Sequence, residues 1–197
     1  MSKFEILENL LSKNNGYLKT ADAFSAGISR TYIGEFVREH NLERVAHGLY
    51  MSQDAWIDGM YVLQVRYPSA IFSHETALYL LGLASREPIQ YAVTLKSGTN
   101  ASGLSNQGVK VYKVKEIIFD IGVEERKSPA GHMLRVYNPE RTLCDLIRSR
   151  RNIEIQDLQS AFKDYVRLKE KNIPLLMRYA KALSVEKMVR QYLEVLL

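Results

Sequence analysis

Cysteine is almost absent from this sequence, since Cys144 is the only one in 197 residues. A single thiol cannot build a disulfide framework, which fits a chain that works in a reducing compartment. No apolar run approaches the roughly 20 residues that are needed to cross a bilayer. The first residues, Met-Ser-Lys-Phe-Glu, lack the basic and apolar succession of a signal peptide. We therefore expect a cytoplasmic protein with no membrane partner.

Catalytic and metal-binding spacings are missing as well. His74-Glu75 is not followed by the second histidine that a zinc-binding helix needs, because position 78 is leucine. The Gly- and Ser-rich stretch 97–108 lacks the Gly-Lys-Ser/Thr ending of a phosphate-binding loop, and no Gly-x-Ser-x-Gly element occurs. We expect no enzyme, no cofactor and no metal. An active site assembled from residues distant in sequence is the less favoured alternative.

The composition is that of a folded protein with a basic surplus. Hydrophobic residues make up 46% of the chain and there are 12 tyrosines, which excludes disorder. Lys and Arg number 27 against 22 Asp and Glu, a formal charge of +5 that favours an acidic partner such as nucleic acid. Residues 1–52 are balanced, whereas residues 148–190 carry eleven cations against five acids. A solvated helix face is the alternative explanation for that run.

The first fifty residues predict three helices followed by a small hairpin. Ser2 and the glutamate three residues later have capping-box spacing, and Thr20 is placed to cap a second, short helix. Gly27 suits a tight turn between helices, and Ser29 suits the cap of a third helix that runs to about residue 40. Residues 42–51 look like two short strands. This order is that of a winged helix-turn-helix, whose third helix enters the major groove of DNA.

Polar side chains near the start of the third helix and on the hairpin are the candidate DNA contacts. Arg30, Thr31 and Tyr32 are expected to meet bases or adjacent phosphates, and Ser29 a phosphate at the helix N-terminus. The complete set is Thr20, Ser29, Arg30, Thr31, Tyr32, Arg38, Arg44 and His47. Two alternatives stay open: the module binds a protein, or Tyr32 simply packs in the core.

The remainder predicts a connecting helix and a mixed second domain. Residues 54–67 form the connecting helix, capped by Asp54 and ended by Pro68. Strands are expected at 91–95, 109–114 and 134–136, and over 117–123, where apolar residues alternate. A mobile loop is expected at 97–108. The fold class is therefore α+β, with a winged helix in 1–53, and a small, largely antiparallel sheet and a C-terminal helical part in 68–197.

The last sixty residues predict four amphipathic helices whose outer faces are basic. The apolar positions of each helix point inward, which leaves Lys163 and Arg167 together on an outer face. The candidate basic face comprises Arg148, Arg150, Arg151, Lys163, Arg167, Lys169, Lys171, Arg178 and Lys181. Cys144 lies beside leucines and is expected to be a small buried residue.

Two segments after the predicted winged helix carry a family resemblance. They read Ser73-His-Glu-Thr-Ala-Leu-Tyr-Leu-Leu-Gly-Leu83 and Asn138-Pro-Glu-Arg-Thr-Leu-Cys-Asp-Leu-Ile-Arg-Ser149. With the N-terminal pattern, they make the whole chain resemble the AbiEi family, the antitoxins of bacterial abortive-infection systems. The resemblance implies an N-terminal domain that binds inverted repeats in its own operon promoter and represses transcription. It also implies a C-terminal antitoxin domain that counters a nucleotidyltransferase-like toxin without a stable complex.

Three functional hypotheses follow from these observations. The first is a DNA-binding autorepressor and antitoxin. The second is a module that binds RNA or a partner protein through the basic C-terminal face and shields the target of the toxin. The third, an enzyme that reverses the product of the toxin, has the least support in the sequence.

Overall fold

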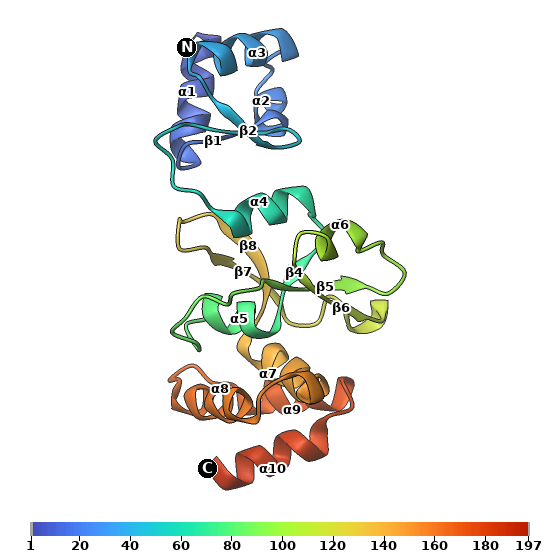
Figure 1. Cartoon of the computed structure of the whole chain (residues 1–197). Helices are drawn as coiled ribbons and strands as arrows, with labels where there is room; N and C mark the ends of the chain where they lie inside the picture. The colour runs from blue at the N-terminus through green and yellow to red at the C-terminus, as the bar shows by residue number, and fades with distance from the viewer. Residues whose placement is uncertain (1, 197) are drawn as a thin grey trace. The chain divides into compact units, whose positions relative to one another are not determined.

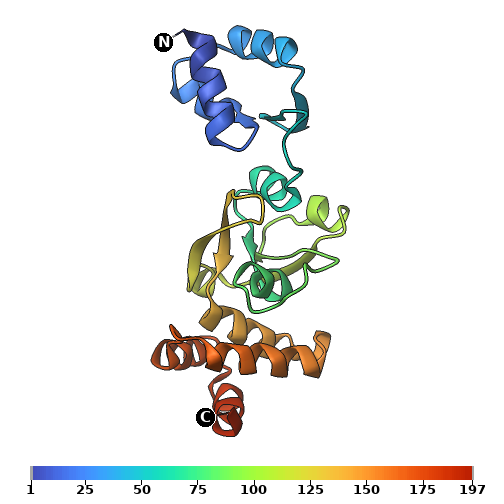
Figure 2. The same ribbon diagram turned by 90° about the vertical axis from the view of Figure 1, so that its left-hand side faces the viewer.

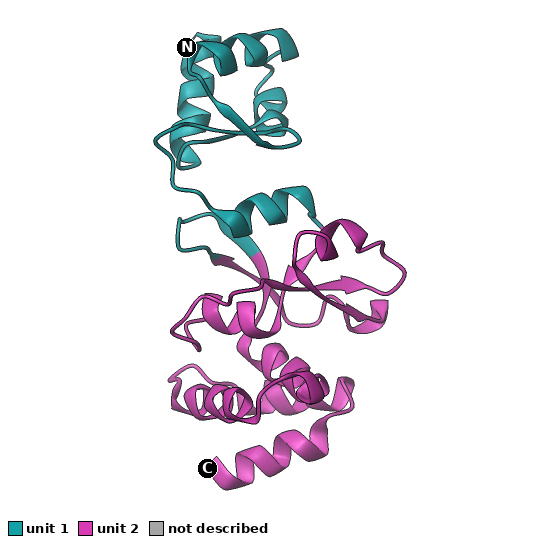
Figure 3. Cartoon of the chain, viewed as in Figure 1, with its two compact units in different colours: residues 1–68, 127–134 teal, residues 69–126, 135–197 magenta. Residues whose placement is uncertain are grey.

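The computed structural model describes residues 2–196, which form two compact units (Figure 3). Unit 1 consists of residues 1–68 together with the distant segment 127–134, and unit 2 of residues 69–126 and 135–197. Within the described residues, no helix combines the length and the apolar character required to cross a membrane. The chain mixes helices and sheets, which confirms the α+β class.

Unit 1 contains four helices and a three-stranded antiparallel sheet of order β1-β3-β2 (Figure 1). The sequence predicted only the β2–β3 hairpin, and β1 joins it as an additional strand next to β3. Leu7, Leu18, Ile33 and Phe36 are buried together between the helices and the sheet. The elements are α1 (Lys3–Lys13), β1 (Tyr17–Lys19), α2 (Thr20–Ser25), α3 (Arg30–Glu39), β2 (Glu43–Ala46), β3 (Leu49–Met51) and α4 (Gly59–Arg66).

The helix caps of unit 1 agree with the sequence in part. Ser2 and Glu5 form both hydrogen bonds of the predicted capping box at the start of α1. Ser29 stands at the N-cap of α3, but its side chain makes no capping hydrogen bond. Thr20 is the first residue of α2 rather than its cap, because its amide and its hydroxyl both donate to the carbonyl of Gly48.

The connecting helix α4 begins later than predicted. Its N-cap is Asp58, which accepts from the amide of Tyr61, rather than Asp54. Trp56 and Ile57 precede the helix, with 86% and 81% of their surface exposed. The helix is capped at Asp58 because this residue is buried, where its carboxylate contacts Ser128 and His132, whereas Asp54 is exposed.

Asp58 and His132 form a buried ion pair at the centre of unit 1. Nδ1 of His132 lies 2.7 Å from Oδ2 of Asp58, and Nε2 lies 3.2 Å from the carbonyl oxygen of Asn14. The imidazole thus lies between the carboxylate of Asp58 and a backbone carbonyl. The hydroxyl of Ser128 also donates to Asp58. Segment 127–134 is thereby joined to α1 and α4.

Aromatic rings and hydrogen bonds enclose this pair. The ring of Tyr61 stacks on that of His132 at a centroid distance of 4.0 Å, and Tyr17 meets it edge-on at 4.8 Å. Burial alone would raise the pKa of Asp58, but hydrogen bonds from His132, Ser128 and the Tyr61 amide outweigh it, so the pKa lies below its ordinary value of 3.8. The ionised carboxylate is the form that stabilises unit 1.

Unit 2 is built on a five-stranded sheet of order β6-β5-β4-β8-β7. β4 pairs antiparallel with β5, whereas the β4–β8 and β5–β6 pairs are parallel. The sheet is therefore mixed, and the prediction of a largely antiparallel sheet is wrong for it. The strands are β4 (Ile71–Phe72), β5 (Ala92–Lys96), β6 (Lys110–Val114), β7 (Val123–Lys127) and β8 (Met133–Tyr137).

The connection between β5 and β6 explains one of the parallel pairs. Parallel neighbours need a long crossover, and residues 97–109 supply one between β5 and β6. This stretch, predicted as a mobile loop, contains the short helix α6 (Ser102–Ser105) with a buried Leu104. The alternating stretch 117–123 is not a strand either. It begins in the 3₁₀ helix η1 (Glu116–Ile118), and the buried guanidinium of Arg141 binds its Ile118 carbonyl.

Helices complete unit 2. α7, α8, α9 and α10 form one group in both views of the chain (Figures 1 and 2). Their apolar faces bury a common core that includes Leu146, Phe162, Leu176 and Val189, as the sequence predicted. The helices are α5 (His74–Leu80), α7 (Pro139–Arg148), η2 (Arg150–Asn152), α8 (Ile155–Arg167), α9 (Ile173–Ala182) and α10 (Glu186–Leu196).

We expect Asp58→Ala to lower the free energy of unfolding of unit 1 by about 3 kcal/mol or more at pH 7, because the His132 ring, the Ser128 hydroxyl and the Tyr61 amide all lose their buried hydrogen-bond acceptor. The depressed pKa means that ionised Asp58 stabilises the fold above pH 3.8 and that this contribution is lost as the pH falls through the lower, folded value. Urea unfolding between pH 3 and 7, monitored in unit 1, measures both effects.

Asp54→Ala is the matched control, because Asp54 is the exposed residue that the sequence pattern placed at the helix cap. Its effect is expected to be small at every pH. Equal losses in the two variants would contradict the role given to the buried pair.

Candidate nucleic-acid interface

A surface pocket of about 370 Å³ lies in unit 1 between the start of α3 and the β2–β3 hairpin. Four of the eight predicted DNA-contact residues line it: Thr20, Arg30, Arg44 and His47. They come from three places in the sequence, namely the start of α2, the start of α3 and the hairpin. We call this pocket the α3–hairpin groove. Its lining is completed by Phe24, Ile33, Gly34, Gly48 and Tyr50.

The hairpin is fixed against α2 by its turn. Gly48 has φ +69°, a left-handed conformation that glycine adopts without strain. A Cβ at this position would lie 2.7 Å from Oγ1 of Thr20, so the close approach also requires glycine. The carbonyl of Gly48 then accepts the amide of Thr20 at 2.9 Å. This contact fixes the hairpin side of the groove against the start of α2.

The groove is locally cationic although its domain is not. Arg30 and Arg44 are both exposed at its walls, and His47 lies beside them. None of the nine lining residues is acidic. The six carboxylates of residues 1–52 are placed elsewhere, so the zero net charge of this part does not describe its groove. Such a local excess of positive charge attracts a polyanion.

The other four predicted contact residues lie outside the groove lining. Ser29 and Thr31 are exposed at the first turn of α3. Arg38 is exposed one turn beyond Gly34, and its Nε donates to the Gly34 carbonyl at 3.3 Å. The structure therefore gathers half of the predicted set into one groove.

Tyr32 does not pack in the core. Its side chain is 39% exposed, and Nζ of Lys3 lies 4.1 Å from its ring centroid. This contact brings a lysine from α1 to the start of α3. Lys3 thereby joins the surface around the candidate contacts.

Phe24, Gly34 and Tyr50 line the groove but were not predicted as contact residues, because they are aromatic or lack a side chain. Phe24 has 51% of its surface exposed. Tyr50 and Gly34 carry no charge and gave no electrostatic signal. The amphipathic period of α2 places Phe24 one position from the buried Ala23, and that offset is the signal that marks it as outward.

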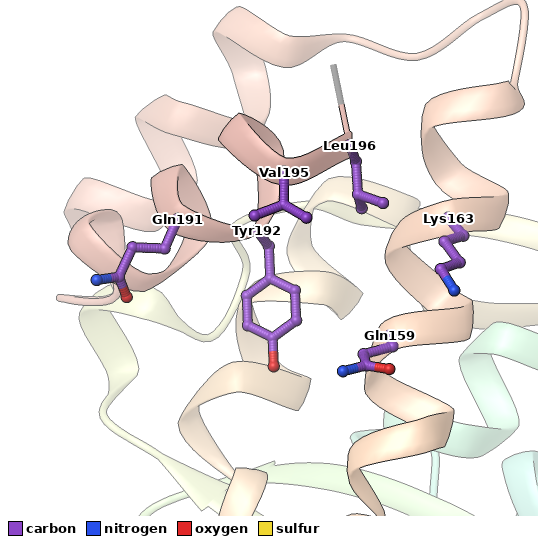
Figure 4. Close-up of a pocket in the computed structure, with 6 residues that line it drawn as sticks. All are labelled: Gln159, Lys163, Gln191, Tyr192, Val195 and Leu196. Carbon is purple, nitrogen blue, oxygen red and sulfur yellow. The ribbon is translucent and has the colours of Figure 1, made fainter.

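The nine residues of the predicted basic face are all exposed. They lie on α7, η2, α8, the α8–α9 connection and α9. Lys163 borders an apolar pocket of about 370 Å³ between α8 and α10, where Tyr192 points into the space (Figure 4). Lys169 lines a different pocket, beside α7. These two members therefore do not share a cavity.

Cys144 and His74, the residues considered for catalysis, are buried in surroundings that keep both side chains uncharged. Burial raises the pKa of the Cys144 thiol to about 12, so it stays protonated at neutral pH. Burial, with the nearby cations Lys110, Arg141 and Arg148, holds the pKa of His74 well below its ordinary value, and the ring is neutral. Among residues 2–196, no group of three or more His, Cys, Asp or Glu side chains is placed to hold a metal.

Comparisons with known proteins place this groove in context. No curated protein matches the chain. The crystal structure of the RV2827C protein from Mycobacterium tuberculosis has a similar fold, with a TM-score of 0.56 and 16% sequence identity over 89% of this chain and 70% of that one. At this identity the likeness concerns the fold alone.

A family model described as "Transcriptional regulator, AbiEi antitoxin" matches residues 5–53. This range spans α1 to β3 and contains all nine residues of the α3–hairpin groove. The segments 73–83 and 138–149, which also carried the resemblance, lie outside it. The match agrees with the resemblance predicted from the sequence, and it extends over residues 5–53 of this chain.

Proposed function

We propose that this protein is a DNA-binding autorepressor and antitoxin. Residues 1–53 are its winged helix-turn-helix and residues 68–197 are its antitoxin domain. Residues 54–67 connect the two domains. The observation that carries the DNA-binding part is the α3–hairpin groove, where Arg30, Arg44 and His47 meet without an acidic neighbour in the lining. The family match to a transcriptional regulator over the same residues supports it.

In this proposal α3 is the recognition helix and the β2–β3 hairpin is the wing. The N-terminal residues of a recognition helix reach base edges in the major groove, and Arg30 and Thr31 occupy that part of α3. The uncapped first turn of α3 offers amide groups to a phosphate, with no acidic residue to oppose it. Arg44 and His47 on the wing contact the phosphate backbone of the DNA, and these contacts fix the position of the protein along the duplex.

A gel-shift titration tests the function directly. DNA from upstream of the gene, including inverted repeats, is compared with scrambled DNA of equal length over a salt series. If about six phosphates are neutralised, the logarithm of affinity should fall with the logarithm of salt at a slope near −5. Preference for the upstream DNA supports the repressor. Weak and equal binding to both DNAs would contradict it.

We expect Arg30→Ala to weaken binding to the upstream DNA more than to scrambled DNA, by about 1–3 kcal/mol, because a guanidinium that reads a base edge discriminates by that amount. Lys13→Ala is the matched control, since it removes one exposed cation from α1, outside the groove lining. Its loss should be small and equal on both DNAs. Equal losses from Arg30→Ala on the two DNAs would reduce that residue to a phosphate contact.

The antitoxin part of the proposal rests on the family description and on the exposed basic face. All nine cations are exposed, and two of them, Arg148 and Arg167, also pair with Asp145 and Asp164. The resemblance implies a nucleotidyltransferase-like toxin that need not bind the antitoxin stably. An RNA acceptor used by the toxin is a polyanion that this face would shield. The same chemistry serves nonspecific contacts with DNA phosphates.

Charge reversal separates this face from the rest of unit 2. We expect the double variant Lys163→Glu/Lys181→Glu to abolish rescue of cells from the toxin while operator binding stays within about twofold of wild type, because the groove is unchanged. Lys113→Glu/Lys115→Glu is the control, with two exposed lysines outside the face. Rescue that survives in the first pair would return these lysines to an ordinary solvated surface.

A further inference from the structure

Gly34 stands in the middle of α3, at a position where glycine needs a reason. Glycine destabilises a helix interior relative to alanine, because it loses more conformational freedom on folding. The two nearest glycines have clear reasons within the fold. Gly27 adopts φ +77° in the turn before α3, and Gly48 combines φ +69° with the contact to Thr20.

No such reason exists at Gly34. The residue belongs to the regular part of α3, and its φ is not in the left-handed region. A Cβ built there would meet no atom within 4 Å. The side chain of Arg38 folds back to the Gly34 carbonyl, but it too lies beyond that distance from the Cβ position. An alanine would therefore fit the free protein and strengthen the helix.

The position of Gly34 supplies the missing reason. Gly34 lines the α3–hairpin groove, and Arg30 and Arg38 lie one turn before and one turn after it on the same helix face. The helix thus has no side chain at position 34, between the two arginines, and the Arg38 guanidinium contacts the backbone carbonyl there. A helix with its side chains is 10–12 Å across, whereas the major groove of DNA is about 12 Å wide. Without a side chain at position 34, the helix can enter the major groove more deeply than it could with one.

We infer that Gly34 is the point of closest approach between α3 and duplex DNA, where the DNA contacts the helix backbone directly. The inference rests on the proposed function and adds a specificity-determining position to it. Arg30 and Arg38 reach their DNA partners because no side chain at position 34 holds the helix away. The glycine is retained for the complex, at a cost to the stability of the free protein.

The test is a pair of opposite effects in the full-length chain. Gly34→Ala and Gly34→Leu should each raise the melting temperature, by about 2–4 °C for alanine. Both should weaken binding to the upstream DNA, and the loss should grow with side-chain size to about tenfold or more for leucine. Melting is measured without DNA, and binding in the gel-shift assay described above.

Asn9→Ala and Asn9→Leu are the matched controls. Asn9 is exposed on α1, so these changes also improve helix propensity but leave the groove untouched. They should raise the melting temperature and leave DNA binding at the wild-type level.

The outcomes that would overturn the inference are distinct. Binding of Gly34→Leu within twofold of wild type would overturn the close approach while leaving the proposed function intact. A lower melting temperature in Gly34→Ala would show that the free fold needs the glycine, and would overturn it as well. Failure of the wild-type chain to bind any DNA would overturn the proposed function and the inference together.

Discussion

The buried pair of Asp58 and His132 is the interaction on which unit 1 depends. It is the reason why residues 127–134, which are remote in sequence, belong to the same compact unit as the first 68 residues. The same carboxylate caps α4, and Nε2 of the same imidazole lies 3.2 Å from the Asn14 carbonyl at the end of α1. Removing the charge from one member would leave the other buried without a partner, so the two form a single structural element.

Local patterns predicted the helices of this chain well, because each helix is governed by residues three or four positions apart. The capping box at Ser2 and the apolar stripes of α7 to α10 are of this kind. The strand-like alternation over 117–123 failed for a physical reason. Arg141, twenty or more residues further along the chain, binds the carbonyls of Ile118 and Ile121 and holds that stretch in turns. No local pattern contains such a contact.

The candidate site shows the same division. Arg30, Arg44 and His47, which were proposed from their charge and their place in the predicted helix and hairpin, line one groove. Gly34, Phe24 and Tyr50 were not proposed, since their role depends on which face of the groove they line. The sequence pattern also did not predict which strands pair in parallel. Alternating apolar residues can indicate a strand, but the direction of its neighbour depends on how the chain crosses between them. Net charge misleads in a related way, since residues 1–52 sum to zero while their groove is cationic.

The tether between Thr20 and Gly48 has a consequence for the thermodynamics of recognition. A wing that is ordered before binding loses little conformational entropy when a ligand arrives. Association of such a preformed surface proceeds without a folding step, so its heat-capacity change reflects only the surface that becomes buried and not the ordering of a disordered segment. Under the proposed function, the contact at the hairpin turn positions the wing before DNA arrives, so the DNA is the partner that changes shape on binding.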